Sequence, residues 1–314
     1  MLDKNFIKPQ SYHSSKTPLI GGILIYLPLL FMSFFLQHVI NVELILIVSF
    51  FFIIGIIEDI YENINPYFRL IIMIVGSLFL FTILDFRITK IELNFFDVLL
   101  TNYYFSIFFT AACFIIIING SNFIDGYNGL LSLHSLIIIA SILVIGNYSY
   151  DVKNFYQIVI FVLILHFLFH NFPKAKAFLG DSGAYIIGAL ISYMSIKFFQ
   201  QIDVSPFFIC IILFFISFET IFSFIRKIVL NKSPFLPDKN HLHMLIYFRV
   251  LESTNDKKKS NYLASILYNL ITIILIFPSF FYLNNDFLSC VHLIILFISY
   301  FVIYFSLFKN LKKG

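Results

Sequence analysis

Residues 98–118 read VLLTNYYFSIFFTAACFIIII, a run of apolar and aromatic side chains without one charged group. A helix of about 20 such residues is long enough to cross the hydrocarbon core of a bilayer. Nine comparable apolar runs lie at residues 18–40, 42–57, 67–84, 129–146, 155–169, 183–200, 206–230, 262–283 and 287–308. These runs are continuous, whereas the strands of a membrane barrel alternate apolar and polar residues. The sequence therefore predicts an all-α polytopic transmembrane helical bundle of about ten spans.

The composition of the whole chain indicates the same class. Of its 314 residues, 60% are apolar and only 12% are Asp, Glu, Lys or Arg, whereas a soluble domain carries roughly 25% charged residues. A soluble globular enzyme is excluded, because the chain could not supply the polar surface that water requires. The cysteines Cys113, Cys210 and Cys290 all lie inside apolar runs, which argues against a disulfide-stapled secreted fold. No linker separates two domains, so we expect one integral-membrane domain over residues 1–314.

Basic residues are distributed unevenly between the two sets of loops. All but four of the 21 Lys and Arg residues lie in one set, and the exceptions are Arg87, Lys90, Lys153 and Lys197. Because basic loops stay on the cytoplasmic side of a membrane, we expect a multi-pass protein of the inner (cytoplasmic) membrane with both termini in the cytoplasm. The net charge of +4 then reflects topology and indicates no nucleic-acid partner.

Acidic residues gather at the predicted cytoplasmic helix ends, where Glu58-Asp59, Asp125, Asp181 and Asp238 each adjoin an apolar run. An intramembrane charge is costly, so such residues are candidates for function. Two adjacent carboxylates such as Glu58 and Asp59 can share a divalent cation, because hard oxygen ligands suit Mg²⁺. The alternative is an ordinary helix exit, followed by a turn at Asn65-Pro66.

Residues 119–130 read NGSNFIDGYNGL and form the most polar segment between two runs. Asn119, Asn122 and Asp125 recur every three residues, so one helical turn or cap could direct them toward one point. Glycines let backbone N–H groups approach a ligand closely. Asn-Gly and Asp-Gly also form ordinary turns, but so many polar and glycine residues favour a binding loop.

Residues 178–183, FLGDSG, precede another run. Asp181 or Ser182 could cap the helix that follows. Alternatively, the helix N-terminus suits phosphate oxygens, and Asp181 would bring a metal ion to them. Both alternatives stay open on the sequence alone.

Residues 234–243, PFLPDKNHLH, lie in the large loop predicted to be cytoplasmic. His241 and His243 do not share a helix face at this spacing, which disfavours a structural zinc site. Together with Lys239 they are placed to donate hydrogen bonds to phosphate. Glu219 lies deep in a run, where it either pairs with Arg226 two turns later or lines a cavity.

In chain order, these motifs resemble the polyprenyl-phosphate N-acetylhexosamine-1-phosphate transferases, glycosyltransferase family 4, which is related to the phospho-N-acetylmuramoyl-pentapeptide transferases. The resemblance rests on Asp3-Lys4, His13 and residues 17–22, then on Glu58-Asp59, residues 119–130, residues 171–173 with 180–183, and Asp238 with residues 241–243. Glu58 stands where the family has Asp, and Asn128 stands at its later Asp. Both departures resemble the branch that serves surface-polysaccharide assembly. The family normally has another helix before Asp3-Lys4, so its first transmembrane helix is expected to be missing from this chain.

The resemblance implies transfer of an N-acetylhexosamine 1-phosphate from a UDP-sugar to polyprenyl (undecaprenyl) phosphate with release of UMP. This step initiates lipid-linked surface glycans such as O-antigen, lipopolysaccharide and cell-wall polymers. The implied cofactor is Mg²⁺, or Mn²⁺ in its place. The implied partners are UDP-N-acetylhexosamine, polyprenyl phosphate and membrane lipid, at an active site on the cytoplasmic face. A homodimer is an open alternative to a monomer.

The resemblance also implies residue roles. Asp181 is the leading metal ligand, and Asp59 with Glu58 holds the acceptor or assists the metal, either being the candidate if a base is used. Asn119, Asn122 and Asp125 shape the nucleotide and pyrophosphate site, and Asn128 pairs with uracil. The diphosphate or sugar is contacted by Lys239, His241 and His243, assisted by Lys16.

Two other functions compete with this interpretation. A membrane transporter or lipid-carrier flippase would also be a polytopic bundle with a carboxylate, Glu219, inside a span. Such a protein, however, places its polar groups near the midplane, whereas here they gather at the cytoplasmic rim. A catalytically silent, truncated paralogue is the second alternative.

Overall fold

The computed structural model describes residues 17–61, 64–146, 155–233 and 239–311. Within these ranges the regular structure is helical, apart from a single backbone bridge between Leu19 and Phe178. The helices in chain order are α1 Gly21–Phe35, α2 Val42–Ile60, α3 Pro66–Leu84, α4 Asn94–Leu100, α5 Tyr103–Ile124, α6 Leu130–Gly146, α7 Phe155–Asn171, α8 Gly180–Gln201, α9 Pro206–Ile212, α10 Phe214–Val229, α11 Leu242–Thr254, α12 Lys257–Ile276, the 3₁₀ turn η2 Phe277–Phe281, and α13 Asp286–Leu311. The predicted all-α class is confirmed.

Each of the ten apolar runs corresponds to a helix or to a pair of helices in sequence. Five helices are long and apolar enough to cross a membrane: α3, α5, α8, α12 with η2, and α13. The pair α9 and α10 would add a sixth span, but its halves meet at an angle of 76°. Helices α1, α6 and α7 are apolar but shorter. The chain is therefore a multi-pass membrane protein, while the number of ten spans and the orientation of the termini remain predictions.

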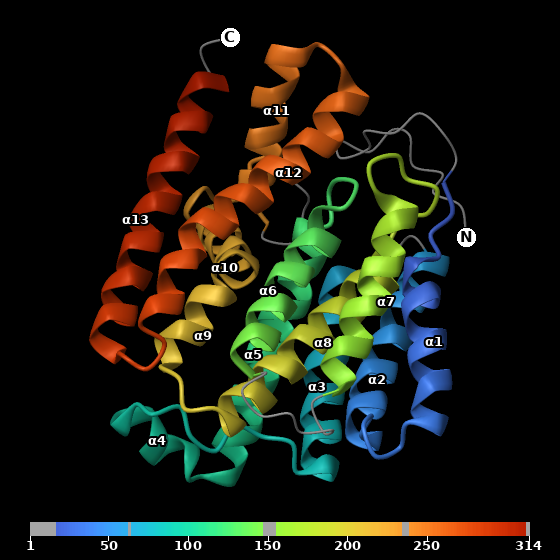
Figure 1. Cartoon of the computed structure of the whole chain (residues 1–314), viewed down its shortest axis with the longest axis vertical. Helices are drawn as coiled ribbons and strands as arrows, with labels where there is room; N and C mark the ends of the chain where they lie inside the picture. Colours follow the sequence, from blue (N-terminus) through green and yellow to red (C-terminus); the bar gives the residue numbers. More distant parts are fainter. Residues whose placement is uncertain (1–16, 62–63, 147–154, 234–238, 312–314) are drawn as a thin grey trace.

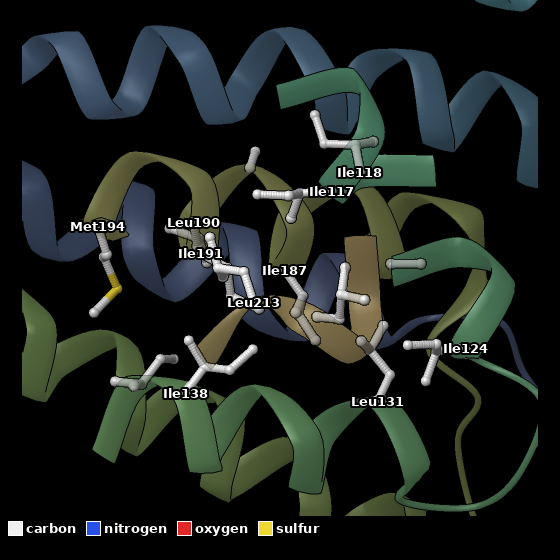
Figure 2. Packing of buried hydrophobic residues seen from close by; sticks show 14 of the residues in the cluster. Ile117, Ile118, Ile124, Leu131, Ile138, Ile187, Leu190, Ile191, Met194 and Leu213 are labelled. Carbon is white, nitrogen blue, oxygen red and sulfur yellow. The ribbon is translucent and has the colours of Figure 1, made fainter. Parts of the chain in front are cut away.

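Helix α8 is the centre of the bundle. Its apolar stretch is 83% buried, against 17% for α3, so α8 lies inside the protein and α3 at its edge. Helix α2 packs most extensively against α8, and α5, α1 and α6 also contact it. Figure 2 shows isoleucine and leucine side chains of α5, α6 and α8 meeting in one apolar cluster. The burial of this cluster provides the main favourable packing around α8.

Two glycines allow other helices to approach the beginning of α8. A Cβ atom at Gly55 of α2 would lie 2.4 Å from the Ser182 Cα atom, and one at Gly22 of α1 would lie 2.2 Å from the Ser182 Oγ atom. These distances are shorter than van der Waals contact, so any larger residue would push the helices apart. Glycine at both positions therefore lets α1 and α2 close on the segment that contains Asp181.

Replacing Gly55 by alanine should destabilise the bundle. The added methyl group meets backbone atoms of α8 that cannot rotate away, and such overpacking typically costs about 1–3 kcal/mol. Thermal unfolding in detergent should show a lower apparent Tm than the wild-type protein. Gly146→Ala is the matched control, because its Cβ would lie 3.9 Å from the Phe198 ring, in ordinary contact. Equal Tm values for both variants would contradict the close packing of α2 on α8.

The two sets of loops lie at opposite ends of the bundle. In Figure 1, α4 lies at the end opposite α11. Helix α4 belongs to a loop predicted to be external, and α11 to the long loop predicted to be cytoplasmic. The separation of the two loop sets in space matches the separation that the basic residues predict.

Candidate active site

The N-terminus of α8 is capped by a carboxylate from α2. The Asp59 Oδ1 atom accepts a hydrogen bond from the Asp181 N–H group at 2.7 Å, and its Oδ2 atom accepts from the Ser182 N–H at 3.1 Å and the Ser182 hydroxyl at 2.5 Å. The first N–H groups of a helix lack partners within it, and a negative charge is favourable there. Of the two alternatives that the sequence left open for this segment, a cap of α8 by Asp181 or Ser182 is not the one found, since no side chain of its own segment caps the helix.

This arrangement leaves the Asp181 side chain available for another role. Residue 180 is a glycine with φ +74°, and a Cβ there would lie 2.7 Å from the Asp59 Oδ2 atom. The backbone therefore needs glycine at this position both for its left-handed conformation and for the approach of Asp59.

Residues 18–22 bind to the same segment from the other side. The Phe178 N–H donates to the Pro18 carbonyl at 2.9 Å, and the Gly21 and Gly22 N–H groups donate to the carbonyls of Phe178 and Leu179 at 3.0 and 3.1 Å. Three motifs separated widely in the sequence, residues 17–22, 58–59 and 178–183, thus form one unit. Lys16, which was expected to assist at the site, lies outside the described residues, as do Asp3-Lys4 and His13.

Glu58 is held by two partners. The Arg69 Nη1 atom donates to its Oε1 atom and the Tyr185 hydroxyl to its Oε2 atom, both at 2.5 Å. The Asn122 amide donates to the Tyr185 hydroxyl at 3.4 Å. One hydrogen-bonded network of side chains therefore links helices α2, α3, α5 and α8. Neither Arg69 nor Tyr185 is among the site residues predicted from the sequence.

The sequence contains a feature that indicates a role for Arg69, but none that indicates a role for Tyr185. Arg69 is a cation in the first turn of an otherwise apolar helix and follows the acidic pair closely. A costly charge in such a position indicates a partner. Tyr185 lies in an apolar stretch, where the sequence alone does not distinguish a core tyrosine from a functional one.

Asp125 is close enough to Asp181 and Asp59 for their charges to act on its carboxyl group. It follows the last residue of α5, and burial, then the negative charges of Asp181 and Asp59, raises the pKa of the Asp125 carboxyl from 3.8 to about 8. No hydrogen bond to the Asp125 carboxylate occurs among the described residues. The Asn122 side chain lies near the Asp181 carboxylate. The carboxylates predicted from three separate segments are therefore brought together.

The segment 119–130 is partly helical, because α5 continues to Ile124. The spacing of Asn119, Asn122 and Asp125 thus follows the end of one helix, as expected. The Asn119 amide donates to the Ile115 carbonyl at 2.8 Å. The Asn128 amide donates to the Pro173 carbonyl at 3.0 Å, and the Asn128 N–H donates to the Asn261 Oδ1 atom at 2.9 Å. Asn128 therefore ties this loop to its neighbours, while its proposed pairing with uracil remains a prediction.

The histidine segment packs against this loop. A Cβ at Gly126 would lie 3.1 Å from the His243 Nε2 atom, and the His241 ring lies 5.6 Å from the Phe123 ring. Both histidines are buried. Lys239 is exposed, and Asp238 lies outside the described residues. The structure thus brings His241 and His243 to the site, and leaves the role of Lys239 a prediction.

Glu219 does not pair with Arg226. Its carboxylate accepts hydrogen bonds from the Leu242 N–H, from His241 and from Tyr300. Arg226 instead donates to the Asn240 carbonyl and to the Tyr304 hydroxyl. Of the two alternatives for Glu219, the ion pair with Arg226 does not form, because both side chains hydrogen-bond to residues 240–242 at the beginning of α11.

The carboxylates of the site could supply some, but not all, of the oxygen ligands of a divalent cation. Among the residues that the structure describes, no group of three or more His, Cys, Asp or Glu side chains is arranged to hold a metal ion. Asp125 and Asp181 nevertheless bring two carboxylates near each other, and none of the residues that the structure describes donates a hydrogen bond to the Asp125 carboxylate. Mg²⁺ is commonly held by only one or two carboxylates, with waters and substrate phosphates as its other ligands. The donor set is therefore suited to a cation that binds together with phosphate.

Replacing Asp125 by asparagine should stabilise the metal-free protein in a pH-dependent way. The pKa of the Asp125 carboxyl is near 8 in the folded protein and 3.8 in the unfolded chain. The unfolded chain therefore loses this proton first, and the free energy of unfolding falls as the pH rises from about 4 to 8. Above pH 8 the loss of stability is constant. In EDTA, the Tm advantage of Asp125→Asn over the wild type should therefore grow from pH 5 to pH 8. Asp203→Asn, in an exposed loop, is the control. A Tm difference that is the same at every pH would contradict the burial of this charge.

Comparison with known proteins agrees with this geometry. Residues 20–199, more than half of the chain, match the family described as glycosyl transferase family 4. An undecaprenyl-phosphate alpha-N-acetylglucosaminyl 1-phosphate transferase of Thermotoga maritima is 31% identical over 235 residues, which cover 74% of this chain and 68% of that protein. A decaprenyl-phosphate N-acetylglucosaminephosphotransferase of Mycolicibacterium smegmatis is 32% identical over 160 residues, 44% of this chain and 39% of that protein.

A third relative belongs to the related group that the sequence motifs indicated. A phospho-N-acetylmuramoyl-pentapeptide-transferase of Streptococcus uberis is 31% identical over 205 residues, 59% of this chain and 60% of that protein. The matched part of the chain contains the acidic pair, the polar segment that ends α5 and the beginning of α8. By this match and by the converging carboxylates, the chain belongs to glycosyl transferase family 4.

Proposed function

We propose that this protein transfers an N-acetylhexosamine 1-phosphate from a UDP-sugar to polyprenyl phosphate and releases UMP. The reaction takes place at the cytoplasmic face of the inner membrane and begins the synthesis of a lipid-linked surface glycan. The observation that carries the proposal is the convergence of Asp59, Asp125 and Asp181, from α2, the end of α5 and the start of α8, at one end of a membrane bundle. The names of the relatives support the same chemistry.

The chemistry requires little proton transfer. The acceptor is a phosphate monoester whose second pKa is about 6, so it is mostly a dianion at neutral pH. One of its oxygens forms a bond to the sugar-bearing phosphorus of the UDP-sugar, and the bond from that phosphorus to the bridging oxygen breaks. UMP leaves with the electron pair. Positioning and charge neutralisation therefore provide most of the catalysis.

A divalent cation, Mg²⁺ or Mn²⁺, would neutralise the phosphate charges. Asp181 is the leading ligand, and the carboxylate of Asp125, which interacts electrostatically with it, is a candidate to join it. Asp59 was the second ligand that the family resemblance implied. Since both of its oxygens accept hydrogen bonds from α8, it also serves to hold Asp181 in place.

The other residues of the site would bind and orient the substrates. Glu58 is held by Arg69 and Tyr185 near the first turn of α3, where the phosphate end of the lipid acceptor would bind.

Asn119, Asn122 and Asn128 would face the nucleotide. His241, His243 and the exposed Lys239 would donate hydrogen bonds to the diphosphate or sugar, with Lys16 in support.

The proposal is tested by UMP release. The full chain in lipid nanodiscs, supplied with Mg²⁺, undecaprenyl phosphate and a panel of UDP-N-acetyl sugars, should release UMP with at least one of them. Omission of the lipid acceptor or addition of EDTA should stop the release. A protein that releases UMP from no UDP-sugar, under conditions where a relative is active, would refute the proposed function and favour a transporter or a silent paralogue.

A further inference from the structure

The segment that begins α11 is held by a deeply buried carboxylate. Glu219 of α10 is 1% exposed. Its Oε1 atom accepts hydrogen bonds from the Leu242 N–H at 2.9 Å and from the His241 Nδ1–H at 3.1 Å, and its Oε2 atom accepts from the Tyr300 hydroxyl at 2.9 Å. A charge in such a place is costly unless it is fully hydrogen-bonded, and here three donors surround it.

A second set of hydrogen bonds holds Asn240, the residue before His241. The Arg226 Nη1 atom donates to the Asn240 carbonyl at 2.8 Å and to the Tyr304 hydroxyl at 3.0 Å, and the Tyr304 hydroxyl donates to the same carbonyl at 3.0 Å. Arg226 lies two turns after Glu219 on α10, and Tyr304 lies one turn after Tyr300 on α13. Side chains of α10 and α13 therefore hold residues 240–242 in place through two separate sets of hydrogen bonds.

The contact with Glu219 determines how His241 faces the site. The Nδ1 atom is directed at Glu219, and because the two nitrogens of an imidazole point in different directions, Nε2 is turned away from α10. The centroid of the His241 ring lies 5.6 Å from that of the Phe123 ring and 5.5 Å from that of the His243 ring, which stacks on it. His243 in turn approaches Gly126, which follows Asp125. The imidazole thus lies between the buried carboxylate and the loop that carries the acidic site.

We propose that Glu219 is a positioning residue for the transfer reaction, which orients His241 so that its Nε2 atom contacts the diphosphate of the UDP-sugar. This inference rests on the proposed function and extends it to a residue in the interior of the bundle. A carboxylate that fixes one ring nitrogen sets the tautomer and orientation presented by the other. Glu219 itself does not touch the substrate.

The experiment compares Glu219→Gln with Glu252→Gln, the same substitution at a half-exposed surface position on α11. Loss of one hydrogen bond to a charged group corresponds to a decrease of about 10- to 100-fold in kcat/KM. Glu219→Gln should show such a decrease and weaken the Kd for UDP-sugar, and Glu252→Gln should match the wild type. Kd is measured by isothermal titration, which works even where turnover is lost.

Coupling to His241 separates positioning from a general structural effect. In a His241→Ala background, Glu219→Gln should weaken the Kd by less than about 3-fold, because residues that act through one another are not additive. An undiminished effect in that background, or no effect in the wild-type background, would overturn the proposal.

A second variant covers the case in which Glu219→Gln does not fold. Tyr300→Phe removes one hydrogen bond from Glu219 and leaves the carboxylate in place. It should give a smaller decrease in affinity that also disappears with His241→Ala, and an unchanged Kd would overturn the proposal. Absence of UMP release by the wild-type protein would instead refute the proposed function, so the two failures are distinguishable.

Discussion

Replacing Asp181 by asparagine should abolish UMP release, a loss of roughly 10³-fold or more in kcat. The Asp181 backbone is held by Asp59 of another helix, and its carboxylate acts electrostatically on Asp125. Asparagine has nearly the same size and can keep the backbone bond to Asp59, so the fold should survive. The loss then reports the charge alone. Steady-state UMP release and the Tm should be measured together on the same protein.

Asp203→Asn is the control for this prediction. It makes the same chemical change at an exposed carboxylate, just after α8 ends. It should leave UMP release and Tm unchanged. If Asp181→Asn retained the wild-type rate, Asp181 would not be the leading metal ligand. If it lost activity and unfolded, the residue would be structural rather than catalytic.

Replacing Asp59 by asparagine should reduce both stability and activity. The amide keeps one acceptor oxygen but turns an NH₂ group toward the N–H of Ser182, so at least one charge-assisted bond is lost and a buried donor is left without a partner. The expected cost is about 2–3 kcal/mol, which lowers the Tm by several degrees. Activity should fall because the start of α8, which carries Asp181, is no longer anchored.

Ser182→Ala distinguishes the two roles of Asp59. It removes only the hydroxyl bond to Asp59 and keeps the carboxylate. It should cost less stability than Asp59→Asn and retain most of the activity. If Asp59→Asn instead removed activity at an unchanged Tm, Asp59 would act mainly as a metal ligand, as the family resemblance implied.

Much of the site could be predicted where it depends on local sequence. The spacing of Asn119, Asn122 and Asp125 follows the helical period, and α5 does continue to Ile124 with Asp125 directly after it. The acidic pair at 58–59 lies at the end of α2, as the boundary of its apolar run indicates. Such features depend on residues only a few positions apart, and the helical period determines which of these residues lie on the same face.

Partners that are distant in the chain could not be predicted in the same way. A cap of α8 by its own Asp181 or Ser182 was one of two open alternatives, but the cap comes from Asp59, 122 positions away. A pair between Glu219 and Arg226, which share a helix face, was likewise one of two alternatives. They separate because the beginning of α11 offers each of them closer hydrogen-bonding groups.

By itself the sequence determined the class of protein, an all-helical membrane bundle, and the segments that carry its polar residues, because hydrophobic runs and helical period are properties of adjacent residues. Only the tertiary structure decided which polar groups meet: Asp59 with the first turn of α8, Glu58 with Arg69 and Tyr185, and Glu219 with His241. A buried charge takes the donor that packing brings within hydrogen-bonding distance, and in a bundle that donor belongs to a helix whose place is decided by packing rather than by its position in the chain.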